Sequence, residues 1–171
     1  MLRWDRVRIP RDSEVDVTTK QDFTDEEWAR IVRAPMVAGL AISLADPGGP
    51  IEATKETMAT TKTATNPPSR EQLLTEVALD VQTMTQQKTH PLKGYKPSSG
   101  SQILDELRAT QALVAAKATP EEAQAYAAWL TASAQAAAEA AKDGGFMGFH
   151  AKRISDGEQA MLDQVRQAVT D

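Results

Sequence analysis

The chain has 171 residues, of which 41% are hydrophobic and 25% charged, which suits one globular domain with its own buried core. Its 19 basic side chains form no long cluster and are outnumbered by 24 acidic ones, giving a formal charge of −5, so nucleic acid is a poor candidate partner. Cysteine is absent, which excludes disulfides, thiolate metal sites and cysteine nucleophiles.

The N-terminal region, residues 1–22, mixes arginines with acids and lacks helical periodicity, so we expect an extended or partly disordered arm. No long apolar run follows the first methionine. We therefore expect no signal peptide and predict a cytoplasmic protein. The longest uncharged apolar stretch, 34–45, is too short to span a bilayer as a helix, which favours a buried core helix and no membrane span.

The first helix is marked by a capping box, in which Thr24 caps the helix and Glu27 is its third residue. Phe23 and Trp28 flank this box as a hydrophobic staple. Pro35 removes one backbone donor from the helix. The residues that follow are apolar on almost every face, which predicts a place in the middle of a bundle or at an interface between subunits.

The second helix is predicted to begin with Pro50, after a turn at 46–49, and to run to Ala64. It is rich in threonine and has few large apolar residues, so its helix propensity is only moderate. We expect it at the periphery of the fold, or lining something polar.

Three further capping boxes, at 69–72, 119–122 and 155–158, predict the starts of a third, fifth and sixth helix. A fourth helix is predicted to end near Ala118. Eleven of the residues in 123–141 are alanine, which gives high helix propensity and lets neighbouring backbones approach closely. No alternating run favours a sheet and no fixed period favours a solenoid.

Together these signals predict an all-α, single-domain helical bundle of about five or six helices over 23–171, preceded by the arm at 1–22.

Recognisable catalytic motifs are absent from the sequence. A di-iron or di-manganese bundle needs Glu three residues before each of two histidines, whereas Gln87 precedes His90 and Met147 precedes His150 at that spacing. There is no Gly-x-Ser-x-Gly elbow and no Walker pattern. We therefore predict no catalytic residue, no metal and no cofactor. A carboxylate-only cation site stays as an alternative, although solvated helix faces explain the same residues: Glu52, Glu56, Glu71 and Glu76.

The segment 144–153 is the most distinctive in composition, because two phenylalanines sit among glycines between two helices. Its glycines would let backbone donors approach a ligand, and its apolar residues would dock on a partner. The alternative is structural, with a glycine ending the helix and the aromatic residues closing the core. The candidate contact residues are Gly145, Phe146, Met147, Phe149, His150, Lys152 and Arg153.

A second candidate is the loop at 89–99, where backbone donors, lysines and the start of the next helix would hold an anion. A flexible connection whose serine caps that helix is the alternative. The candidate residues are His90, Lys93, Tyr95 and Lys96. A third idea is an apolar pocket, although core packing explains the same spacing; its residues would be Trp28, Trp129, Met36, Met58 and Met84.

The leading functional prediction is a non-catalytic protein that acts through self-association, as a homo-oligomer, or through a protein partner, using the apolar first hairpin and the segment 144–153. The alternative is a binding protein or small enzyme with a pocket between helices for an apolar or anionic ligand. A role at a membrane surface comes third, because the acidic charge disfavours it.

Overall fold

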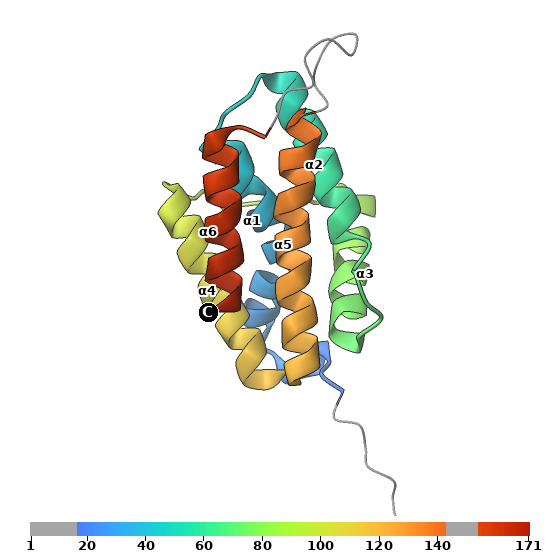
Figure 1. Ribbon diagram of the computed structural model, residues 1–171. Coiled ribbons are helices and arrows are strands. Elements are labelled where there is room, and N and C mark those ends of the chain that lie inside the picture. The colour runs from blue at the N-terminus through green and yellow to red at the C-terminus, as the bar shows by residue number, and fades with distance from the viewer. Residues whose placement is uncertain (1–16, 143–153) are drawn as a thin grey trace, which may run out of the picture.

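The computed structural model describes residues 17–142 and 154–171, and within these ranges the chain forms α-helices, one 3₁₀ turn (Lys20–Asp22) and no strand. The six helices are α1 (Asp25–Ala45), α2 (Pro50–Ala64), α3 (Gln72–Gln86), α4 (Gly100–Lys117), α5 (Pro120–Lys142) and α6 (Asp156–Thr170). They pack side by side into one bundle (Figure 1), which confirms the predicted all-α class and number of helices.

The central element is α1, which packs against all five other helices and lies behind α5 and α6 in Figure 1. It begins as predicted: the Glu27 amide donates to the Thr24 hydroxyl at 3.2 Å, and the Thr24 amide donates to the Glu27 carboxylate at 2.8 Å. The rings of Phe23 and Trp28 lie 5.8 Å apart beside this cap. Among the described helices α1 alone is long and apolar enough to cross a membrane, but 61% of its apolar window is buried inside the bundle, as in a core helix.

The helix continues through Pro35, and the bundle compensates for the donor that this proline lacks. In an α-helix the amide of residue 35 would donate to the carbonyl of Ile31. That carbonyl instead accepts a hydrogen bond at 2.8 Å from the hydroxyl of Tyr126, a fully buried residue of α5. Burial raises the pKa of Tyr126 well above its ordinary value, so the hydroxyl keeps the proton that it donates.

The alanine-rich α5 packs against α1, α2 and α6. Its alanines at 134, 137 and 138 are fully buried and let the neighbouring backbones come close. Trp129 adds the bulk, and its indole N–H donates to the carbonyl of Thr63 at 2.8 Å. The buried polar atoms of this face are therefore satisfied.

Two local features differ from the sequence-based expectation. The capping box at 69–72 does not form: α3 begins at Gln72 behind Glu71, and the Ser69 hydroxyl is buried with no hydrogen-bond partner among the described residues. The chain uses 69–71 to connect α2 with α3, so the serine lies too early to cap. The end of the predicted arm, 17–22, packs on the bundle, where the Thr18 amide donates to Glu122 at 3.3 Å.

Candidate ligand pocket

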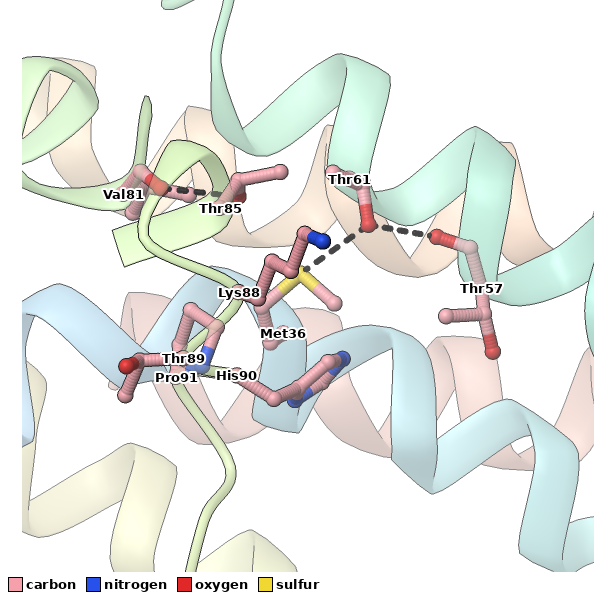
Figure 2. Close-up of a pocket in the computed structure, with 9 residues that line it drawn as sticks. All are labelled: Met36, Thr57, Thr61, Val81, Thr85, Lys88, Thr89, His90 and Pro91. Atoms are coloured by element: carbon pink, nitrogen blue, oxygen red, sulfur yellow. Dashed lines mark hydrogen bonds between the residues drawn. The ribbon is translucent and has the colours of Figure 1, made fainter. Parts of the chain in front are cut away.

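A cavity of about 230 Å³ lies where α1, α2, α3 and the chain after α3 meet. Figure 2 shows its lining, which consists of Met36, Thr57, Thr61, Val81, Thr85, Lys88, Thr89, His90 and Pro91. A more open hollow of about 480 Å³ between α2 and α3 shares Thr57, Thr61 and Thr85 with it. A small one of about 70 Å³ shares Met36, Thr57 and His90. The three hollows are neighbours that share lining residues, and we call them together the threonine pocket.

The floor of the threonine pocket is apolar and belongs to the packed core. Met36 of α1 is 3% exposed and Val81 of α3 is fully buried, so both belong to the packed core. Their positions follow from the one-face spacing of apolar residues along each helix. A floor made of core residues holds its shape when the pocket is empty, which reduces the cost of binding a ligand.

The walls are threonines whose hydroxyl protons are already engaged. Thr57 donates to the carbonyl of Ala53 at 2.8 Å, Thr61 to that of Thr57 at 2.8 Å, and Thr85 to that of Val81 at 2.9 Å. Such bonds let threonine sit within a helix without leaving a donor free. Each hydroxyl oxygen can still accept a hydrogen bond, and each methyl group adds apolar surface.

The charged side chains in the lining of the threonine pocket are lysines, and the carboxylate of Glu56 lies behind Ser43, a lining residue of the smallest hollow. Lys88 and His90 line the main cavity and Lys62 lines the open hollow, whereas none of the three linings contains Asp or Glu. In Figure 2 the ammonium of Lys88 extends toward Thr61, and the imidazole of His90 lies beside Met36. The His90 Nδ1 accepts the amide of Leu92 at 3.1 Å, so the neutral ring carries its proton on Nε2 and can donate from there.

The turn that carries Lys88 has an uncommon backbone. Lys88 has a φ of 55° and is the one non-glycine residue with positive φ in the described parts of the chain. The Thr89 amide donates to the Met84 carbonyl at 2.8 Å and the Lys88 amide to that of Thr85 at 3.1 Å, which is a Schellman motif. Glycine is the usual residue at this left-handed position because it has no Cβ.

The four residues of the candidate anion loop do not come together. His90 lines the cavity, while Lys93 and Lys96 are exposed and line none of these hollows. Tyr95 packs under Arg33 of α1, whose guanidinium lies 4.9 Å from the ring centre. Burial and the Glu106 carboxylate raise the pKa of Tyr95.

The other candidate residues are placed as follows. Gly145, Phe146, Met147, Phe149, His150, Lys152 and Arg153 lie outside the described residues. Of the residues suggested for an apolar pocket, Met36 and Met58 line the threonine pocket. Trp28 and Trp129 are core residues, and the indole of Trp28 donates to Asp80 at 2.7 Å.

The carboxylates considered for a cation site form no cluster of metal-binding side chains in the described ranges. Glu56 of α2 is the most buried of them, at 2% exposed, and it accepts a hydrogen bond from the Ser43 hydroxyl of α1. Burial raises the pKa of Glu56, and the negative charges of Glu158, Glu52 and Asp46 act in the same direction.

Comparisons of the chain with models of protein families, with curated proteins and with solved structures find no match. The basis for a functional assignment is therefore the pocket itself. Sequence reasoning named Met36 and His90 and expected the threonine-rich helix at the periphery of the fold or lining something polar. It missed Lys88, because nothing in the local sequence indicates a left-handed lysine.

Proposed function

We propose that this protein binds a small molecule in the threonine pocket. The observation that carries the proposal is a preformed cavity with a core-packed apolar floor, acceptor-bearing walls and a basic rim, in a protein whose net charge is −5. Pockets that combine an apolar surface with a few converging polar groups are typical ligand sites.

The geometry favours this function over association through the first hairpin. Most of the apolar stretch that suggested an interface is used by the core of the same chain: Met36, Val37, Ala38, Ala41 and Ile42 are all buried. Association through the segment 144–153, or with a partner on another surface, stays a prediction with no support from the described residues.

Three eight-carbon probes test the proposal: 1-octanol, octanoate and octyl phosphate, titrated against protein with labelled threonine methyl groups. We expect at least one probe to shift the methyl signals of Thr57, Thr61 and Thr85, with a dissociation constant on the order of 1 mM or below for about ten non-hydrogen atoms. Native mass spectrometry of the purified protein provides an independent check, because a retained ligand would appear as mass lost on denaturation.

A matched pair of variants locates the binding. Thr85 lines the pocket, whereas Thr83 lies on the same helix outside its lining. Both are exposed, and each hydroxyl donates to the carbonyl four residues earlier. Thr85→Trp should weaken binding at least about tenfold by filling the cavity, while Thr83→Trp should leave it unchanged. Equal effects of the two variants, or no binding by any probe, would refute the proposed site.

A further inference from the structure

We infer that the ligand of the threonine pocket is an amphipathic anion, a carboxylate or phosphate ester with an apolar body, and that Lys88 is the residue that selects it. This inference rests on the proposed function and adds the chemical class of the ligand.

The distribution of charge is the first argument. Acidic side chains outnumber basic ones in the whole chain, 24 to 19, yet the linings of the three neighbouring hollows contain Lys62, Lys88 and His90 and no carboxylate. Lys88 makes no ion pair within the described residues. Lys20, which lines a different surface hollow, is by contrast paired with Asp80 at 2.8 Å. An unpaired ammonium at the rim of an apolar cavity favours a bound anion.

The backbone at Lys88 is the second argument. A left-handed conformation is unfavourable for a residue with a Cβ by about 1–2 kcal/mol, and glycine removes this penalty. The loop does use glycine at its other left-handed position, Gly94, where φ is 81°. The lysine also lies near the negative end of the α3 dipole, which offsets part of the penalty. What lysine adds over glycine is a side chain that extends into the cavity.

The lining of the pocket offers contacts for both parts of such a ligand. Lys88 and the Nε2 of His90 supply donors for a carboxylate or phosphate at the rim. Met36 and Val81 supply the apolar floor against which a hydrocarbon body packs. The threonine oxygens keep the walls weakly polar without adding a full negative charge.

The test compares probes that differ only in the head group. Wild-type protein should bind octanoate and octyl phosphate about tenfold more tightly than 1-octanol, since a hydrogen bond to a charged group is worth roughly that factor. Lys88→Gly should abolish this preference while unfolding at the same or a higher denaturant concentration. Lys88→Arg should retain the preference, and Lys93→Gln, at an exposed lysine outside the pocket, should match wild type.

The outcomes separate this inference from the function on which it rests. If 1-octanol binds as well as the anions and Lys88→Gly changes nothing, the ligand class is wrong and the pocket stands. If no probe binds, the pocket itself is refuted. Sedimentation with vesicles of phosphatidic acid distinguishes two sources of the same chemistry: pelleting that depends on Lys88 assigns a lipid head group, and protein left in the supernatant assigns a free amphiphile.

Discussion

The side chains that pack around α1 differ between its α5 side and its α2 and α3 side. On the α5 side, the buried residues of α5 include alanines and two aromatic residues, of which Tyr126 donates to the Ile31 carbonyl of α1 and Trp129 to the Thr63 carbonyl of α2. Toward α2 and α3, the walls are threonines and a cavity of about 230 Å³ remains. The comparison shows that small side chains let helices close on one another completely, whereas a wall of half-polar β-branched residues leaves room for a ligand.

The largest expected effect comes from truncating a large buried side chain on the α5 side of α1. Trp129→Ala removes a fully buried indole and its bond to Thr63, and it should lower the free energy of unfolding by about 3–5 kcal/mol. Thr61→Ala on the pocket side should change it by no more than about 0.5 kcal/mol, because the wall already borders a cavity. Denaturant unfolding of both variants measures the contrast. Similar losses in the two variants would mean that the two sides are equally packed.

A second prediction concerns the close packing of α2 on α1 at Gly39. A Cβ added at Gly39 would clash with the side chain of Thr60, which is buried and β-branched and so has little freedom to move. Gly39→Ala should therefore lower the free energy of unfolding by about 1–3 kcal/mol through overpacking. Gly49→Ala, where a Cβ meets no neighbouring atom, is the control and should cost less than about 1 kcal/mol, because alanine is a poorer N-cap of α2 than glycine. A neutral Gly39→Ala would show that α2 shifts freely, and that the pocket is not of fixed size.

A third prediction tests how Tyr126 of α5 supplies a hydrogen-bond donor to the Ile31 carbonyl, which Pro35 cannot supply. Tyr126→Phe should cost about 1–2 kcal/mol, because the Ile31 carbonyl stays buried and loses its donor. In a Pro35→Ala background the helix amide can reach that carbonyl, so the same change should cost less. The difference between the two costs is the coupling energy of a double-mutant cycle. A coupling energy of zero would mean that the tyrosine bond and the proline are independent.

Sequence predicted those features of the fold that depend on neighbouring residues. The caps at Thr24 and Ser155 and the bounds of α2 follow from local hydrogen bonding and from proline geometry, and the structure confirms them. The predicted start of α3 was wrong, because a capping pattern does not reveal how many residues a connection needs. The pocket depends on how three helices pack. The sequence identified His90 but not Lys88, because the motif that ends α3 has a lysine where glycine is usual.

The smallest expected effect concerns two acids that contact α1 from different helices, Glu56 from α2 and Glu106 from α4. On the pocket side Glu56 has no cationic partner among the described residues, and burial, with neighbouring negative charges, raises its pKa. On the α4 side burial alone would raise the pKa of Glu106, but the hydrogen bond from Arg33 and the charges of Arg33 and Arg30 lower it. The Arg33–Glu106 contact measures 2.6 Å. The contributions of the two carboxyls to folding stability should therefore change with pH in opposite directions.

Because folded Glu56 holds its proton more tightly than the unfolded chain does, its contribution to stability is present below the unfolded pKa and is lost as pH rises through the raised folded pKa. Glu56→Gln cannot ionise and still offers Ser43 an acceptor, so its stability relative to wild type should increase as pH rises across that window.

The contribution of Glu106 to stability depends on pH in the opposite direction. It is present above the unfolded pKa and is lost as pH falls through the lowered folded pKa. Glu106→Gln should therefore be less stable than wild type at neutral pH, with a deficit that shrinks in acid. Urea unfolding of both variants from pH 7 down to acid measures the two slopes, and parallel slopes would show that α1 meets the two carboxyls in the same electrostatic environment.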